Sequence, residues 1–115
     1  MHEMSLAGGI LRLVEDAALR ERFTRVKRLE LEAGALAGVE VQALRFALQA
    51  IAPGTLLEGA EIAIDEPPGT AWCMTCGETV EIASRVDPCP RCGRWQLAPT
   101  GGMELKVREL IVHDD

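Results

Sequence analysis

The chain has 115 residues and a mass of 12.5 kDa, which is about the size of one ordinary domain and excludes a large multidomain enzyme. Apolar residues make up 48% and charged residues 26%, a composition that excludes intrinsic disorder. The net charge of −6 disfavours nucleic acids and anionic membranes as partners, and no apolar run reaches membrane-spanning length. The first residues lack the features of a signal peptide, so we expect a cytoplasmic protein.

The first half of the chain alternates between helical and strand patterns. Apolar residues recur at helical spacing from Met4 to Ala18, which predicts a first helix. From Val26 to Ala33 the spacing changes to a period of two and predicts a half-buried strand. After a loop at Gly34–Gly38, helical spacing returns from Val41 to Ile51 and stops at Pro53-Gly54.

The second half contains two further predicted strands and an insert between them. Ile62 and Ile64 indicate a short strand, and the alternation that starts at Met103 indicates a longer one, with a bulge near Arg108-Glu109 where the alternation changes phase before Val112. The order of elements predicts an α+β fold in which two helices pack on a three-stranded mixed sheet, with a small insert before the last strand. The predicted domains are residues 1–66 together with 101–115, and residues 67–100.

The four cysteines fall in the insert and form two C-x2-C pairs. Zinc binds four thiolates tetrahedrally, and each pair needs a sharp turn that the following glycines, Gly77 and Gly93, can make at positive φ. This spacing favours a structural zinc site in a small zinc ribbon, whose closed shell leaves no position for a catalytic water. Two disulfides, a redox dithiol and iron are the alternatives. The predicted ligands are Cys73, Cys76, Cys89 and Cys92.

The tryptophans of the chain, Trp72 and Trp95, flank the two cysteine pairs. They either mark a contact surface or cover the metal cluster as its large apolar neighbours, and the covering role is the more ordinary interpretation.

The amino terminus carries a second candidate metal site. The terminal amine of Met1, the imidazole of His2 and the backbone amides of His2 and Glu3 can supply four nitrogens around one ion. Ni(II) and Cu(II) favour such a planar, nitrogen-rich field. Taken alone, a histidine at position 2 is more often a solvated terminal residue.

We call each C-x2-C pair with its following glycine a knuckle: Cys73–Gly77 is the first and Cys89–Gly93 the second. The chain resembles the HypA/HybF family of hydrogenase nickel-incorporation proteins over its whole length, because it begins Met1-His2-Glu3 and has both knuckles before its last strand. The resemblance implies that His2 holds Ni(II) together with the adjoining Met1 and Glu3, and that the four cysteines hold structural Zn(II). It further suggests Glu40 as a minor contributor to the nickel site. A carboxylate favoured by the helix dipole is the ordinary explanation for Glu40.

The resemblance also implies partners and a role. The family delivers Ni(II) to the precursor of the large subunit of [NiFe] hydrogenase together with the GTPase HypB, and some members contribute to urease maturation through its accessory proteins. This role is transfer and not catalysis, and the chain is expected to act as a monomer or homodimer. A zinc-ribbon adaptor or nucleic-acid-binding module is the alternative. An enzyme is disfavoured because the histidines, His2 and His113, lie at opposite ends of the chain and no catalytic triad motif occurs.

Overall fold

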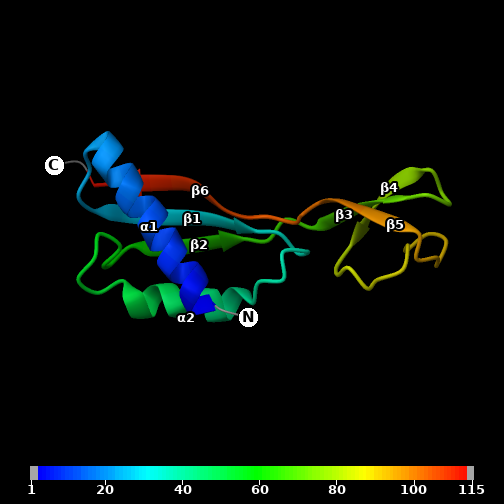
Figure 1. The fold of residues 1–115 in the computed structure, drawn as a ribbon, viewed down its shortest axis with the longest axis horizontal. Helices are drawn as coiled ribbons and strands as arrows, with labels where there is room; N and C mark the ends of the chain where they lie inside the picture. The colour runs from blue at the N-terminus through cyan, green and yellow to red at the C-terminus, as the bar shows by residue number, and fades with distance from the viewer. Residues whose placement is uncertain (1–2, 114–115) are drawn as a thin grey trace. The chain divides into compact units, whose positions relative to one another are not determined.

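The structure is a computed structural model that describes residues 3–113, with two helices and two three-stranded sheets (Figure 1). One sheet has the strand order β2-β1-β6 and the other has the order β4-β3-β5. The elements are α1 (Glu3–Glu21), β1 (Val26–Ala33), α2 (Val41–Ile51), β2 (Glu61–Asp65), β3 (Gly69–Cys73), β4 (Glu78–Ile82), β5 (Leu97–Gly101) and β6 (Leu105–Val112).

The described chain forms two compact units. Unit 1 contains residues 3–31, 39–64 and 107–113, and unit 2 contains residues 32–38 and 65–106. The loop after β1 therefore belongs to unit 2, although the sequence pattern places it in the main domain. The predicted domains, understood as independently folding parts, stay a prediction.

The helices of unit 1 bury one face each and pack against one another. Their buried residues follow the predicted helical spacing. The predicted first helix is confirmed and extends to Glu21, after which Arg22 takes φ 59° and donates its N–H to the Ala18 carbonyl at 2.8 Å. The predicted bounds of the second helix, Val41–Ile51, are those of α2. The buried helical residues are Ala7, Ile10, Val14 and Ala17 in α1, and Val41, Leu44, Ala47 and Leu48 in α2.

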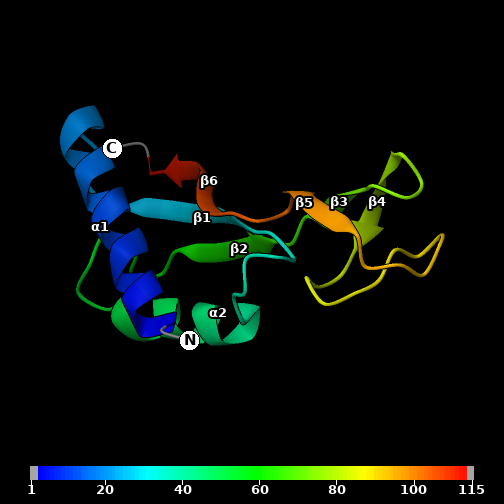
Figure 2. The same cartoon turned by 45° about the vertical axis from the view of Figure 1, so that its right-hand side comes forward.

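The sheet that contains β1 is mixed, as predicted. The arrows of β1 and β2 point the same way in Figure 1, whereas β6 runs in the opposite direction (Figure 2). An ion pair of 2.7 Å between Arg28 and Glu61 joins the beginnings of β1 and β2. At the other edge, the N–H of His113, after β6, donates to the carbonyl of Arg25, before β1, at 3.2 Å. Helix α2 thus connects two parallel strands, which need such a crossover.

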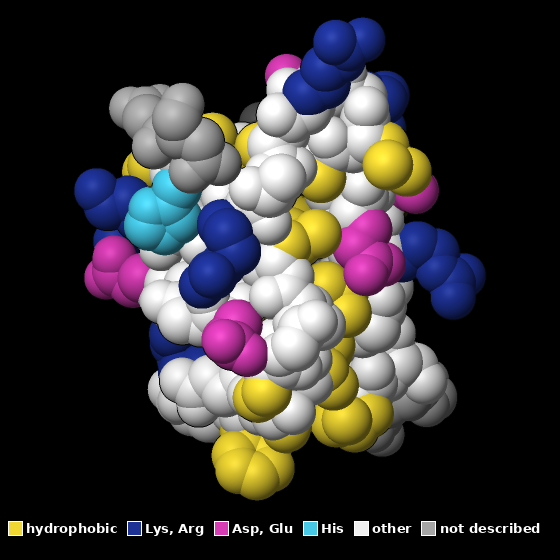
Figure 3. Space-filling model, turned by 90° about the vertical axis from the view of Figure 1, so that its left-hand side faces the viewer, with side chains coloured by type: hydrophobic (Ala, Val, Ile, Leu, Met, Phe, Trp, Pro, Cys, Tyr) yellow, Lys and Arg dark blue, Asp and Glu magenta, His cyan; other side chains and the backbone are white. Residues whose placement is uncertain are grey.

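The surface of unit 1 is mixed in character. In Figure 3 a band of hydrophobic side chains runs between lysine, arginine and acidic side chains. The exposed apolar residues of the unit include Leu13, Leu19 and Phe46. Within residues 3–113, neither helix has the length and apolar character needed to cross a membrane.

Unit 2 is built on an antiparallel sheet with β3 at its centre. Strand β3 pairs with β4 from Gly69 opposite Ile82 to Cys73 opposite Glu78, and it pairs with β5 on its other side. The sequence analysis predicted a small zinc ribbon in this part of the chain but did not predict the bounds of β3 and β5. The sheet buries one face, because Ala71, Cys73, Val80 and Ile82 alternate with exposed neighbours.

Candidate metal centre

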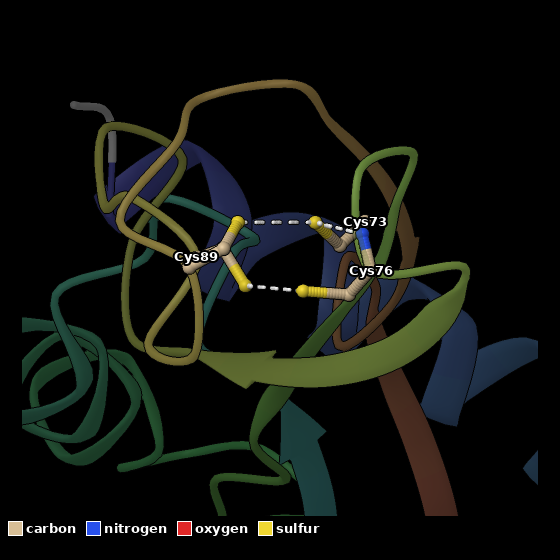
Figure 4. Close-up of side chains that lie close together, drawn as sticks. Cys73, Cys76 and Cys89 are labelled. Atoms are coloured by element: carbon tan, nitrogen blue, oxygen red, sulfur yellow. Dashed lines mark hydrogen bonds between the residues drawn. The ribbon is translucent and has the colours of Figure 1, made fainter.

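The four cysteines converge on one point in unit 2. Cys73 ends β3 and Cys76 follows after a tight turn, while Cys89 and Cys92 lie in the loop between β4 and β5. The Sγ atoms of Cys73 and Cys92 are 3.7 Å apart, and those of Cys76 and Cys89 are 3.9 Å apart. All four sulfurs lie within 4.8 Å of one another. Figure 4 shows the labelled cysteines with their sulfurs turned toward the space between the two knuckles.

These distances fit a metal ion bound by four thiolates. A tetrahedron with Zn–S bonds of about 2.3 Å has sulfur–sulfur edges of about 3.8 Å. The observed separations of 3.7 and 3.9 Å match those edges and are far longer than a disulfide bond of about 2.05 Å. All four cysteines are free thiols, so the two-disulfide alternative is wrong. The set of ligands fits a closed, structural zinc site.

The turn of each knuckle depends on a glycine in the left-handed region. Gly77 has φ 67° and donates its N–H to the Cys73 carbonyl at 2.8 Å. Gly93 has φ 75° and makes the equivalent bond to the Cys89 carbonyl at 2.9 Å. A side chain is strained at such φ values, so the predicted role of these glycines is confirmed.

Backbone N–H groups point at the sulfurs and shift their acidity. The N–H of Cys76 donates to Cys73 Sγ, and that of Arg91 donates to Cys89 Sγ, each at 3.4 Å. Donation from the backbone of Cys92 lowers the pKa of the Cys89 thiol to about 7. A hydrogen bond with the Cys92 side chain raises the pKa of the Cys76 thiol to about 12. Because the Cys76 thiol keeps its proton near neutral pH when no metal is bound, a metal ion that binds this sulfur as a thiolate must displace that proton.

The apolar cover of the site does not come from the tryptophans. Trp72 is 44% exposed and Trp95 is 69% exposed, so the covering role proposed for them is wrong. The buried cluster around the cysteines instead contains Leu36, which is 4% exposed and comes from the loop after β1. In the sequence it appears only as an isolated leucine in Gly-Ala-Leu-Ala-Gly, a weak signal because single apolar residues in loops are often exposed, as Val86 is here. The remaining members are Ala71, Val80, Ile82, Cys73 and Cys89.

Two polar contacts join the knuckles to the sheet. Arg91, in the second knuckle, forms an ion pair with Glu78 at the start of β4. Thr75, in the first knuckle, donates its hydroxyl to the Gln96 side chain at 3.0 Å. These side chains are exposed, so the contacts position the turns and contribute little to stability.

Of the predicted nickel residues, the structure describes Glu3 and Glu40. Met1 and His2 lie outside the described residues. Glu3 begins α1, and its Oε2 atom is buried without a hydrogen-bond partner in the described chain. Glu40 is the N-cap of α2, and its carboxylate accepts the N–H of Ala43 at 2.6 Å. Glu40 therefore lies at the start of a helix, as its ordinary explanation predicts, where it also caps the helix, and its contribution to nickel binding stays a prediction.

Comparison with known proteins decides the family. A family model described as "HypA: Hydrogenase/urease nickel incorporation, metallochaperone, hypA" matches residues 1–112. The chain belongs to the HypA family. It is 61% identical over 115 residues to the hydrogenase maturation factor HypA of Polaromonas naphthalenivorans, with all of both chains covered. It is 62% identical over 114 residues to that of Cupriavidus necator, covering 99% of this chain and 96% of the relative.

Solved structures support the same fold. The solution structure of the Ni metallochaperone HypA from Helicobacter pylori matches with a TM-score of 0.69 and 18% identity, with 100% of each chain covered. Members of the HypA family are nickel metallochaperones of hydrogenase maturation and not enzymes. The family binds nickel and structural zinc, and the four cysteines of this chain fit the zinc.

Proposed function

We propose that this member of the HypA family binds Ni(II) at its amino terminus and delivers it to the precursor of the large subunit of [NiFe] hydrogenase. The ligands are the amine of Met1, the backbone and imidazole nitrogens of His2, and the adjoining Glu3. Two facts support the proposal: the chain begins with Met1-His2-Glu3, and its relatives are hydrogenase maturation factors. A terminal site suits a carrier, because an ion held at a chain end can be released without unfolding a cage.

The carboxylate of Glu3 is the observation that carries the nickel site. A buried carboxylate oxygen without a hydrogen-bond partner is unfavourable, because it has lost water and gained nothing in return. Glu3 Oε2 is such an atom among the described residues, and it lies in the first turn of α1. A cation bound by the preceding residues would compensate this charge, either directly or through the His2 ring.

Glu40 is proposed as a minor contributor. It lies in unit 1 together with Glu3, and the amino-terminal part of α1 lies beside α2 in both ribbon views (Figures 1 and 2). Its carboxylate already caps α2, so a role at the nickel ion uses the remaining acceptor capacity of that group.

The partners follow from what the chain lacks and from the names of its relatives. The sequence contains no phosphate-binding loop, so a nucleotide-dependent step falls to a separate GTPase, for which we propose HypB. We propose that both proteins act in the cytoplasm. The family description names urease beside hydrogenase, so the urease accessory proteins are a second candidate destination.

The decisive experiment is calorimetric titration of Ni(II) into zinc-loaded protein without a tag. The same titration is made on a chain with one extra residue before Met1, which keeps every side chain but displaces the terminal amine. We expect about one Ni(II) to bind the native chain and binding to the extended chain to fall at least about a hundredfold. Equal binding by both chains, or binding by neither, would rule out the amino-terminal site.

Two variants separate the minor ligands. Glu40→Ser keeps a capping hydroxyl but removes the carboxylate, so weaker nickel binding by this variant supports Glu40 as a ligand. His113→Ala removes the exposed histidine at the other end of the chain and should leave nickel binding unchanged. Because the His2 ring must be neutral to bind metal, nickel binding should weaken as the pH falls through about 6.5.

A further inference from the structure

Unit 2 contains an open hollow of about 380 Å³, and none of the four cysteines lines it. This volume is within the range of sites that hold small ligands. The walls come from the loop after β1, the loop after β4 and the segment that precedes β6, all of which belong to unit 2. The lining consists of residues 35–38, Ser84, Arg85 and Met103.

Both loops that line the hollow are held in place within unit 2. On one side, Leu36 donates its N–H to the Gly102 carbonyl at 2.8 Å, and its side chain is buried in the cluster around the cysteines. On the other side, the Asp87 carboxylate accepts the N–H of Ser84 at 3.2 Å and its hydroxyl at 3.1 Å. The hollow is therefore formed before any ligand arrives, which lowers the ordering cost of binding.

Arg85 is the charged residue of the hollow. Its Nε atom donates to the Leu36 carbonyl at 3.3 Å, which holds the guanidinium against the loop after β1. It forms no ion pair with any carboxylate among residues 3–113. A guanidinium has five N–H donors, so four of them, on the two terminal nitrogens, remain for a ligand. These donors form the planar fork that matches a carboxylate.

The other walls of the hollow are small or apolar. Ala35 is exposed, Ala37 is half-buried and Met103 is 39% exposed. Gly38, at φ 73°, contributes no side chain and leaves its part of the hollow open. No aspartate or glutamate lines the hollow, although acidic residues outnumber basic ones by 18 to 12 in the chain. A fixed cation beside small apolar walls is complementary to a ligand with one negative charge and a short aliphatic group.

We propose that this hollow binds the carboxyl terminus of a partner protein that ends in a small aliphatic residue. The terminal carboxylate pairs with the Arg85 guanidinium, and the adjoining side chain contacts Ala35, Ala37 and Met103. A terminal residue fits best, because its carboxylate and its aliphatic side chain share one carbon atom, whereas the carboxylate of an aspartate or glutamate side chain has no aliphatic branch beside it. The inference does not depend on the proposed nickel site.

Nuclear magnetic resonance titration of the zinc-loaded chain tests the site with matched probes. N-acetylvaline has a carboxylate beside an aliphatic side chain, N-acetylvalinamide has the same shape without the charge, and acetate has the charge without the side chain. We expect N-acetylvaline to shift the signals of the Arg85 Nε–H and the Ala37 amide with a Kd of about 1 to 10 mM, and both other probes to bind at least about fivefold more weakly. If either of the other probes binds as tightly as N-acetylvaline, the proposal is wrong.

Substitutions in the same titration locate the site. Arg85→Gln removes the charge and should weaken binding of N-acetylvaline at least about fivefold, and Ala35→Leu should do the same by filling the hollow while leaving the arginine in place. The control is Arg94→Gln, which removes an exposed arginine outside the hollow and should change binding by less than about twofold.

Zinc content is measured in every variant, so that a loss of binding is not confused with unfolding of unit 2. If Arg85→Gln has lost zinc, Ala35→Leu decides the question, because it leaves the bond between Arg85 and the Leu36 carbonyl intact. Undiminished binding by zinc-loaded Ala35→Leu, or an equal loss of binding in Arg94→Gln, would overturn the proposal.

Discussion

The two units of the chain reach a folded state by different means. Unit 1 covers its sheet with two helices and buries large leucines such as Leu29, Leu44 and Leu48, each worth about 1.5 to 3 kcal/mol when removed from water. Unit 2 has a six-residue buried cluster in which Cys73 and Cys89 are two members. Its apolar burial is too small to replace the metal, so the comparison teaches that the same chain uses hydrophobic burial in one unit and coordination in the other.

The two units also carry separate spectroscopic reporters. Both tryptophans, Trp72 and Trp95, lie in unit 2, whereas both described helices lie in unit 1. Tryptophan fluorescence therefore follows the metal-dependent unit, and far-ultraviolet circular dichroism follows mainly the helical one. This separation allows the comparison to be tested on the intact protein.

The largest effect is expected from loss of the metal. Cys89→Ala removes one of four ligands, so zinc should be released, the tryptophan fluorescence should become that of an unfolded segment, and most of the helical signal should remain. Removing zinc from the native chain with a chelator should give the same pair of spectra. Zinc content measured by atomic absorption checks the first point. A full zinc complement in Cys89→Ala, or a complete loss of helix, would contradict the division between the units.

The next largest effect is expected when the hydrophobic core of unit 1 is weakened and the metal centre of unit 2 is left intact. Leu44 is fully buried in α2, so Leu44→Ala should lower the free energy of unfolding followed by circular dichroism by about 2 to 5 kcal/mol. Zinc should stay bound under native conditions. The control is Leu19→Ala, which removes a leucine that is 82% exposed and should change stability by less than about 0.5 kcal/mol. Equal losses in the two variants would mean that burial does not govern this unit.

The smallest effect concerns the exposed ion pair between Arg91 and Glu78. Arg91→Ala should speed zinc release by less than about fivefold, because exposed ion pairs contribute about 0 to 1 kcal/mol. Added salt should speed release in the native chain toward the rate of the variant and leave the variant nearly unchanged. An acceleration of zinc release, measured with a chelating indicator, well above fivefold would contradict this small contribution and show that the ion pair is needed to keep the second knuckle ordered.

Much of the molecule could be predicted from local patterns. The bounds of β1 and α2 agree with the predicted ranges, because apolar periodicity reports directly which side chains face a core. The two C-x2-C pairs and their glycines predicted the metal centre, because that chemistry depends on residues close together in sequence. The combination of Met1-His2-Glu3 with the two C-x2-C pairs predicted the family, and the comparisons confirmed it.

The rest depended on contacts between distant segments. Strands β3 and β5 have five residues each, too few for an apolar period to stand out in the sequence, and β5 is defined by its pairing with β3 across 24 or more positions, as in Trp72 opposite Ala98. The exposure of Trp95 was predicted wrongly, because a large apolar side chain is buried only if some other segment covers it. Leu36 illustrates the converse case, a loop leucine that is buried because other segments cover it. The sequence by itself determined the helices and strands of unit 1, the four cysteines of the metal centre and the family. The tertiary structure alone decided that a leucine from the loop after β1 completes the core around the cysteines, because that contact joins segments far apart in the sequence.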